Sequence, residues 1–212
     1  MNRTILALDT TNLKEAIDVT KKLKNKIFTV KLGLEFFNAH GKNGIKEFNK
    51  IGVNNLMLDL KLKDIPETVY KSIKALNDIE FGFLTIHGQG GKKLIENAKK
   101  AASEIKSKPK IMMVTILTSL SDEDLKDTGN DNTVIKQVDS VSQVFETTGT
   151  TVAIHRYEIR AIIGVTQTPE ENNDICQVTS IEPSAGASDH ELFVGSLGRP
   201  AQYIGFHEHT ES

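Results

Sequence analysis

The chain has 212 residues, of which 38% are hydrophobic and 25% are charged, and its formal net charge at pH 7 is −2. This length and composition exclude wholesale disorder and predict a single globular domain over residues 1–212 with a sizeable core. The near-neutral net charge lacks the excess of basic residues that is typical of nucleic-acid-binding proteins, so a nucleic acid is not an expected partner. No apolar run approaches the roughly 20 residues that span a bilayer, so a membrane is not an expected partner either.

Two kinds of segment alternate through the first two-thirds of the chain. Short segments rich in β-branched and apolar residues predict strands, and segments with apolar residues three and four positions apart predict helices. The predicted strands cover residues 4–9, 27–31, 54–61, 82–87 and 110–117, and the predicted helices cover residues 12–24, 34–50, 66–76 and 91–105. Asn12 and Glu15 have the spacing of a capping box at the first helix. Such a run indicates a parallel sheet with helices outside it.

After residue 121 the pattern is weaker. Helices are predicted over residues 134–145 and 157–163, strands over 150–155, 175–181 and 192–197, and a loop over 183–188. The total is about eight strands, which is the number in a (β/α)₈ TIM barrel. A parallel barrel with outer helices is therefore the predicted fold class, and an open doubly wound sheet is the alternative, because periodicity alone does not separate the two.

The single cysteine, Cys176, allows no internal disulfide and no cysteine-built metal site. A lone thiol is typical of a reducing compartment. The acid at Asp9 interrupts the first apolar segment too early for a secretory signal. These features predict a cytoplasmic protein.

Charged residues gather at the end of the predicted strand over residues 54–61. Asp59 and Lys61 alternate with three leucines, so on a strand the two charges share one face and the leucines share the other. In a parallel barrel the leucines would face the helices, and Asp59 and Lys61 would project into the carboxyl-terminal mouth, where barrel active sites lie. Asp64 follows as the strand ends. The structural alternative is that Asp64 caps the next helix and that Asp59 and Lys61 form an ordinary ion pair.

Other strand ends carry polar residues that would meet these charges. Asp9 and Lys31 close the first two predicted strands, so a barrel would bring both to the same mouth. His87 ends the fourth strand, and a lone histidine there is predicted to be a structural hydrogen-bonding group. No histidine-rich spacing suggests zinc. The segment 195–200 contains glycine and arginine, which suit close approach to a phosphate but also suit an ordinary turn.

These residues together resemble the orotidine 5′-phosphate decarboxylase family of the bacterial type. The resemblance is carried by the run D-L-K-L-K-D-I-P over residues 59–66, by V-K-L-G over 30–33 and by G-R-P over 198–200. Segments A-L-D at 7–9, T-I-H-G at 85–88 and V-T-I-L-T-S at 114–119 match in order and spacing. The match is close from residue 4 to about residue 125 and loose beyond it, where an acid, Glu182, stands in place of an arginine and His190 in place of a glutamine.

The resemblance implies a homodimeric (β/α)₈ barrel, here shortened near the last βα unit. It implies conversion of orotidine 5′-monophosphate to UMP and carbon dioxide in de novo pyrimidine biosynthesis, with no cofactor and no metal. The implied catalytic residues are Lys31, Asp59, Lys61 and Asp64, with Lys61 protonating C6 of the pyrimidine. The implied substrate contacts are Asp9, Lys31, Thr68, Thr118, Ser119, Gly198 and Arg199. Asp64, Ile65 and Thr68 are implied to reach the neighbouring subunit's site.

Two other functions remain open. Related magnesium-dependent sugar-phosphate enzymes, such as 3-keto-L-gulonate-6-phosphate decarboxylase and hexulose-phosphate synthase, share the D-x-K-x-x-D run but carry an acid where Lys31 stands. Lys31 and Ile65-Pro66 therefore favour the orotidine enzyme. The changes around Glu182 motivate the second alternative, a barrel that binds a nucleotide without turning it over.

Overall fold

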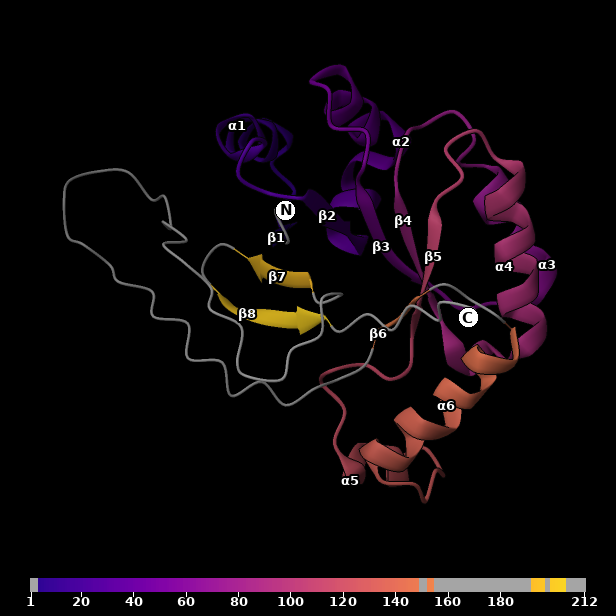
Figure 1. Ribbon diagram of the computed structural model, residues 1–212. Helices are drawn as coiled ribbons and strands as arrows, with labels where there is room; N and C mark the ends of the chain where they lie inside the picture. The colour runs from indigo at the N-terminus through magenta and orange to yellow at the C-terminus, as the bar shows by residue number, and fades with distance from the viewer. Residues whose placement is uncertain (1–3, 149–151, 155–191, 197–198, 205–212) are drawn as a thin grey trace, which may run out of the picture.

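The computed structural model describes residues 4–148, 152–154, 192–196 and 199–204 (Figure 1). The strands of this part form one sheet in the order β6-β5-β4-β3-β2-β1-β7-β8. Those that pair in parallel are β1 (Thr4–Leu8), β2 (Thr29–Gly33), β3 (Met57–Leu62), β4 (Phe83–His87), β5 (Lys110–Val114), β6 (Val152–Ile154) and β7 (Leu192–Ser196). The last strand, β8 (Arg199–Ile204), pairs antiparallel with β7.

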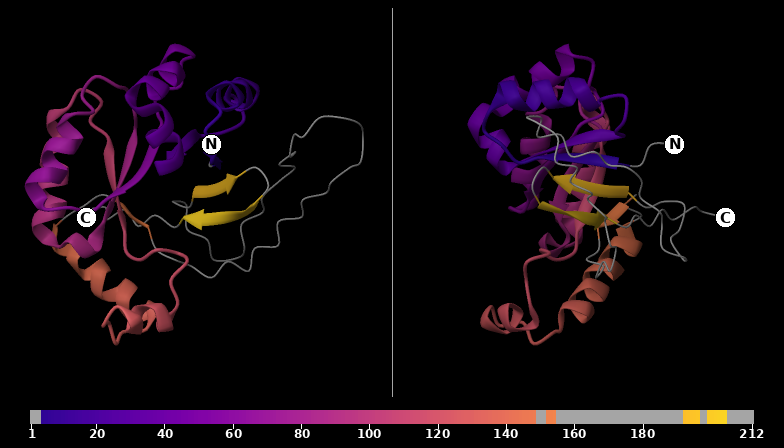
Figure 2. Two further views of the ribbon diagram at one scale, coloured as in Figure 1. Left: turned by 180° about the vertical axis from the view of Figure 1, so that it is seen from behind. Right: turned by 90° about the vertical axis from the view of Figure 1, so that its left-hand side faces the viewer.

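Helices connect the parallel strands and lie outside the sheet, as the two further views in Figure 2 show. They are α1 (Leu13–Leu23), α2 (Leu34–Lys50), α3 (Pro66–Lys74), the single 3₁₀ turn η1 (Gly88–Gly90), α4 (Lys92–Glu104), α5 (Asp122–Asp127) and α6 (Val134–Thr148). The predicted helices up to residue 105 are confirmed within two residues at each end, and α2 agrees with its prediction at both ends. The short helix α5 was not predicted.

The start of α1 shows how local sequence sets an element. The Asn12 side chain accepts a hydrogen bond from the Glu15 amide at 3.1 Å, as the predicted cap requires. The reciprocal half of the capping box differs from the prediction. The Thr10 hydroxyl donates to the Glu15 carboxylate and accepts from the Asn12 amide, so Thr10 takes the place that Glu15 would have had. The turn after β1 is thereby tied to the first turn of α1.

The two faces of the sheet bury different sets of residues. On the helix side, Leu58, Leu84 and their neighbours join the main core with residues from α2, α3 and α4. On the opposite face, Ile5, Ala7, Met57, Phe83 and Met112 form a second, smaller apolar cluster. Side chains two positions apart on a strand lie on the same face of the sheet, as Ile5 and Ala7 of this cluster do. Asp59 lies two positions after Met57, and Thr85 lies two positions after Phe83. Both are therefore placed on the face of the second cluster.

The end of the sheet differs from a regular parallel barrel. β7 was predicted over residues 192–197 and is present, but the strand after it runs antiparallel. Only residues 197–198 separate β7 from β8. A parallel crossover needs about a dozen residues, so two strands this close in sequence pair antiparallel. The departure falls near the last βα unit, where the sequence predicted a shortened barrel.

Several predicted features lie outside the described residues. These are the helix over residues 157–163, the strand over 175–181, the loop over 183–188, Cys176, Glu182, His190 and Gly198. Among the described residues, no helix is long and apolar enough to cross a membrane.

Candidate active site

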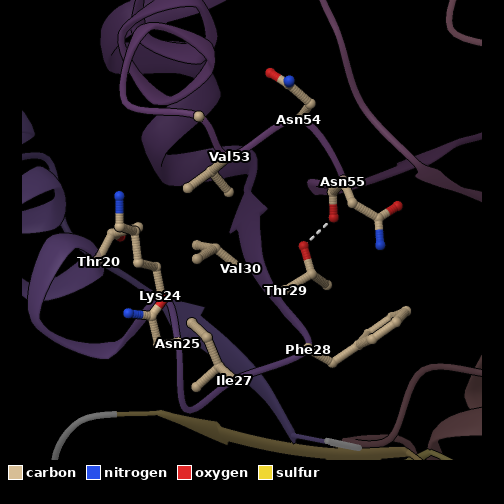
Figure 3. Close-up of a pocket in the computed structure, with 11 residues that line it drawn as sticks. Thr20, Lys24, Asn25, Ile27, Phe28, Thr29, Val30, Val53, Asn54 and Asn55 are labelled. Carbon is tan, nitrogen blue, oxygen red and sulfur yellow. Dashed lines mark hydrogen bonds between the residues drawn. The ribbon is translucent and has the colours of Figure 1, made fainter. Parts of the chain in front are cut away.

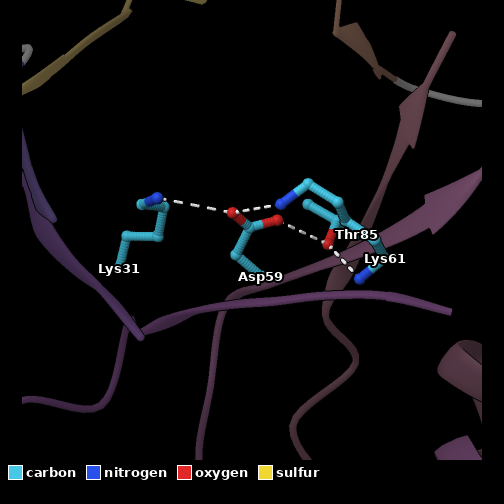
Figure 4. Close-up of polar contacts among 4 residues, drawn as sticks. All are labelled: Lys31, Asp59, Lys61 and Thr85. Atoms are coloured by element: carbon cyan, nitrogen blue, oxygen red, sulfur yellow. Dashed lines mark hydrogen bonds and ion pairs between the residues drawn. The ribbon is translucent and has the colours of Figure 1, made fainter. Parts of the chain in front are cut away.

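A carboxylate held by two lysines lies on the inner face of the sheet, the face that also carries the small apolar cluster. Figure 4 shows Lys31 and Lys61 on either side of this carboxylate, that of Asp59. The Lys61 ammonium is 2.8 Å from Asp59 Oδ2, and the Lys31 ammonium is 3.4 Å from the same oxygen. The other oxygen, Oδ1, accepts a hydrogen bond from the Thr85 hydroxyl at 2.9 Å. The Asp59 side chain is 11% exposed and that of Lys61 is 33% exposed, so the carboxylate is largely buried and the lysine side chain is partly exposed to solvent. We call Lys31, Asp59, Lys61 and Thr85 the charged cluster.

Strand β3 makes a bulge at this cluster. Leu58 pairs with Leu84 and Leu62 pairs with Ile86, so β3 advances four residues while β4 advances two. Thr85 is therefore the single residue of β4 that lies opposite three residues of β3. Lys61 has φ of 46°, a left-handed conformation that costs an L-residue free energy and is rare for lysine. Its amide has no ladder partner at the bulge and donates instead to Thr85 Oγ1 at 2.8 Å.

The lysines keep Asp59 ionised. Burial by itself raises the pKa of the Asp59 carboxyl, but the nearby positive charges of Lys61 and Lys31 and the hydrogen bonds from Lys61 and Thr85 outweigh burial and leave this pKa below its ordinary value. The cluster therefore carries one anion between two cations at neutral pH. A negative charge that developed beside Lys61 would meet a preorganised ammonium.

His87 lies on the same face of β4 as Thr85, two residues further on. Burial, followed by the positive charges of Lys63 and Lys61, lowers the pKa of its imidazole, so the ring is neutral at pH 7. Its Nδ1 is buried without a hydrogen-bond partner among the described residues. The prediction that His87 is a structural hydrogen-bonding group is thus not met at Nδ1 within the described part of the chain.

Asp9 lies at the carboxyl end of β1, as predicted, and its side chain is exposed. It lines a hollow of about 250 Å³ together with Thr10, Glu15 and Glu35. Within the described residues, no hydrogen bond or ion pair joins Asp9 to the charged cluster. The hollow at this strand end leaves room for a polar ligand group beside Asp9.

Asp64, Ile65 and Thr68 are all exposed, and Ile65 is 66% exposed. Asp64 is not the cap of α3, since Ile65 holds that position and the Asp64 carboxylate accepts a hydrogen bond from the Ile65 amide at 2.6 Å. The alternative prediction that Asp64 is the N-cap residue of α3 is therefore wrong. Among the described residues, no hydrogen bond or ion pair joins Asp64 to the charged cluster of its own chain.

The remaining predicted site residues lie at two other places. Thr118 and Ser119 are exposed in a turn that follows β5. The prediction carried this strand to residue 117, but β5 ends at Val114 and the chain turns, with the Leu120 amide bonded to the Leu117 carbonyl. Arg199 is the first residue of β8 and pairs with Ser196, whereas Gly198 lies outside the described residues.

A second hollow, of about 280 Å³, lies at the amino-terminal ends of β2 and β3 (Figure 3). Thr29, Asn54, Asn55 and Lys24 are among its lining residues. The Thr29 hydroxyl donates to the Asn55 carbonyl there. This end of a parallel sheet is opposite to the end at which barrel enzymes place their chemistry, and the charged cluster does not line the hollow. The carboxyl-terminal end is therefore the candidate active site.

Thr85 is the member of the charged cluster that sequence reasoning did not assign to the site. The available signal was a threonine inside an otherwise apolar strand, F-L-T-I, two residues from Phe83 and hence on the inner face. Its contact with Lys61 depends on the bulge, which the sequence of β3 alone does not show.

Comparison with known proteins places the chain in a family. A model of the orotidine 5′-phosphate decarboxylase / HUMPS family matches residues 2–179. The chain belongs to this family. Its similarity to the orotidine 5′-phosphate decarboxylase of Wolbachia sp. subsp. Brugia malayi is 45% identity over 138 residues, covering 65% of this chain and 60% of that protein. Its similarity to the orotidine 5′-phosphate decarboxylase of Ehrlichia canis is 43% identity over 148 residues, covering 70% of this chain and 64% of that protein.

Solved structures of the family agree with the fold. The crystal structure of orotidine 5′-phosphate decarboxylase from Lactobacillus acidophilus matches with a TM-score of 0.64 and 33% identity, over 72% of this chain and 70% of that chain. The parallel sheet with outer helices is the (β/α)₈ barrel architecture of this family, so the predicted fold class is confirmed. The chain spans about 60% of the length of the curated relatives that it matches.

Proposed function

We propose that the chain decarboxylates orotidine 5′-monophosphate to UMP and carbon dioxide, as a carboxy-lyase of pyrimidine biosynthesis. The observation that carries this proposal is that Lys31 and Lys61 both contact Asp59 at the carboxyl end of the parallel strands, in a chain of the orotidine 5′-phosphate decarboxylase / HUMPS family. The relatives named for this activity support it. The proposal includes a single barrel domain over residues 1–212 and a cytoplasmic setting.

The chemistry requires a stabilised carbanion and a proton. Loss of carbon dioxide from C6 of the pyrimidine leaves an electron pair on that carbon. In the proposal the Lys61 ammonium lies beside C6, stabilises the developing negative charge and then donates its proton to C6. Asp59 keeps Lys61 oriented, and its negative charge lies near the departing carboxylate. Lys31 and Asp9 are proposed to contact the ribose, with Thr118 and Ser119 near the pyrimidine.

Phosphate recognition is proposed for Gly198 and Arg199. A guanidinium offers a planar pair of donors that suits a phosphate group. Binding energy from the phosphate, which does not react, can be expressed in the transition state at C6.

A homodimer completes the proposal. Asp64, Ile65 and Thr68 are exposed, and the Asp64 carboxylate accepts a hydrogen bond from the Ile65 amide. Ile65 is a large apolar side chain that is 66% exposed, and a second subunit would cover it. We propose that these three residues reach the neighbouring subunit's site.

The hydrogen bonds that the Asp59 carboxylate already accepts disfavour the magnesium-dependent alternative. Both Asp59 oxygens already accept hydrogen bonds, from Lys31, Lys61 and Thr85. A divalent cation bound at this carboxylate would have to displace an ammonium and would lie beside two positive charges.

The test is the ultraviolet absorbance of orotidine 5′-monophosphate mixed with the purified full chain, with and without EDTA. The proposal predicts spectral loss at the same rate in both samples and no loss with the Lys61→Ala variant. Loss that EDTA abolishes would favour the magnesium-dependent enzymes. Binding of the nucleotide without spectral loss would favour a barrel that binds but does not catalyse.

A further inference from the structure

We propose that Thr85 is a positioning residue for the decarboxylation assigned above, because its one hydroxyl group fixes both the main chain of Lys61 and the carboxylate of Asp59. The inference rests on the proposed function for its catalytic meaning. Its structural content, a hydroxyl that holds the bulge of β3, stands on the contacts of Thr85 alone.

The direction of the two hydrogen bonds is determined by chemistry. A main-chain amide can only donate, so the Lys61 amide donates to Thr85 Oγ1 at 2.8 Å. The ionised Asp59 carboxylate can only accept, so the single proton of the Thr85 hydroxyl points to Asp59 Oδ1 at 2.9 Å. Thr85 is fully buried, so water cannot take over either role without rearrangement. One oxygen atom thus satisfies two groups at once.

The bulge explains why this residue is needed. Lys61 lies in the part of β3 where the pairing with β4 shifts register. Its φ of 46° is unfavourable for a lysine, so contacts with the surrounding residues must stabilise it. The hydrogen bond to Thr85 replaces the ladder bond that the bulge removes. If Lys61 returned to an extended conformation, its side chain would shift relative to the inner face, since a strand alternates its side chains. Thr85 therefore helps to keep the ammonium on the reactive side.

Asp59 is held by the same oxygen. Its two oxygens are shared between the lysines on Oδ2 and the threonine on Oδ1. Without the Thr85 donor, only the two lysines on Oδ2 would hold the carboxylate, and Oδ1 would lose its hydrogen bond. The groups that face Asp59 are Lys31 from β2, Lys61 from β3 and His87 from β4. Thr85 also contacts Asp59 but, unlike these three residues, has no ionisable group. Its hydrogen bond to Asp59 therefore does not depend on the protonation of Thr85.

Three variants separate the hydroxyl from the volume of the side chain. Thr85→Val keeps the shape and removes the hydroxyl. Thr85→Ser keeps the hydroxyl, and Thr85→Ala differs from Thr85→Ser by one oxygen atom. Thr29→Val is the matched control, because Thr29 is also a buried strand threonine whose hydroxyl donates to a main-chain carbonyl, but at the opposite end of the sheet (Figure 3).

The measurements are kcat and KM of the full chain, and the pKa of the Asp59 carboxyl from ¹³C NMR of aspartate-labelled protein, assigned with Asp59→Asn. A hydrogen bond to a charged group is strong enough to change a rate about tenfold or more when it is lost. Thr85→Val should lower kcat by about that factor with a much smaller change in KM, and should raise the pKa of Asp59. Thr85→Ser should restore both, and Thr29→Val should change neither.

The outcomes distinguish this inference from the proposed function. Equal kcat in Thr85→Val and the parent, or equal loss in Thr85→Ser and Thr85→Ala, would overturn the positioning role. If Thr85→Val does not fold, the comparison of Thr85→Ser with Thr85→Ala decides. If the parent itself does not decarboxylate, the proposed function fails, and the pKa of Asp59 still tests the structural role: an unchanged pKa in the folded variants would overturn it.

Discussion

Replacing Asp59 by asparagine should destabilise the protein at neutral pH. The substitution keeps the shape of the side chain and removes its charge, so Lys31 and Lys61 are left facing each other without an anion. Their ammonium groups are both within 3.4 Å of Asp59 Oδ2, and Lys31 is only 14% exposed. Removing one partner of a buried ion pair leaves an uncompensated charge, which is the costly case.

The magnitude follows from the geometry. The Lys61 contact at 2.8 Å is a good charge-assisted hydrogen bond, which contributes about 1.5–3 kcal/mol when well buried. The Lys31 contact at 3.4 Å is long and adds little. Because Lys61 is one-third exposed, solvent screens part of its interaction. The expected loss in the free energy of unfolding is about 2 kcal/mol, or roughly 4–8 °C in Tm for a domain of this size.

The stability difference between the parent and Asp59→Asn should depend on pH. The pKa of Asp59 in the folded state lies below its ordinary value of 3.8. A depressed carboxyl pKa contributes stability that is present above the unfolded-state pKa and is lost as the pH falls through the folded-state value. The difference between the parent and Asp59→Asn should therefore be full at pH 7 and should shrink below about pH 4, as Asp59 of the parent becomes protonated.

Urea unfolding at pH 7 and at several acidic pH values measures this difference. Asp78→Asn is the matched control, because Asp78 also bonds two lysines, Lys42 at 2.7 Å and Lys46 at 2.8 Å, but its side chain is 48% exposed. Solvent screening should make the control change small. A variant Asp59→Asn that is as stable as the parent at pH 7, or a difference that stays constant down to pH 3, would refute the reasoning.

Three further predictions concern activity. Lys61→Ala should lose decarboxylation and still bind a non-reactive UMP analogue, as kinetics and titration would show; near-normal turnover would remove Lys61 from the mechanism. Mixing Lys61→Ala with Asp64→Ala should restore activity through hybrid dimers, and no recovery after confirmed subunit exchange would argue for self-contained sites. Arg199→Ala should weaken binding of the analogue by about tenfold or more, because a charge-assisted bond to phosphate is lost; unchanged binding would show that Arg199 does not contact the phosphate.

Local sequence patterns were sufficient for the elements that have a clear periodicity. The 17 residues of α2 carry an amphipathic pattern, and its bounds agree with the prediction. In β3 the leucines pack on the helix side and Asp59 lies on the inner face, as the alternation indicated. Lys31 and Asp59 come together because they belong to adjacent parallel strands, which the order of βα units predicts.

Other features depend on contacts that a single segment does not contain. The bulge at Lys61 is a relation between β3 and β4, and only their register shows that Thr85 must supply the missing acceptor. Helix α5 has six residues and one buried apolar side chain, Leu125, so it has no periodicity to detect. Its one signal was the capping box between Ser121 and Asp124. The antiparallel β8 follows from the length of one connection, which the family pattern does not predict.

The most direct test of the central claim is the reaction itself in D₂O, followed by NMR of the nucleotide. If Lys61 donates its exchangeable proton to C6, the full chain should convert orotidine 5′-monophosphate to UMP that carries deuterium at C6, with release of one carbon dioxide per UMP. Lys61→Ala should leave the substrate intact under the same conditions. Substrate that stays intact with the folded parent, or UMP formed by Lys61→Ala at the parental rate, would contradict the assignment of this cluster as a decarboxylase site.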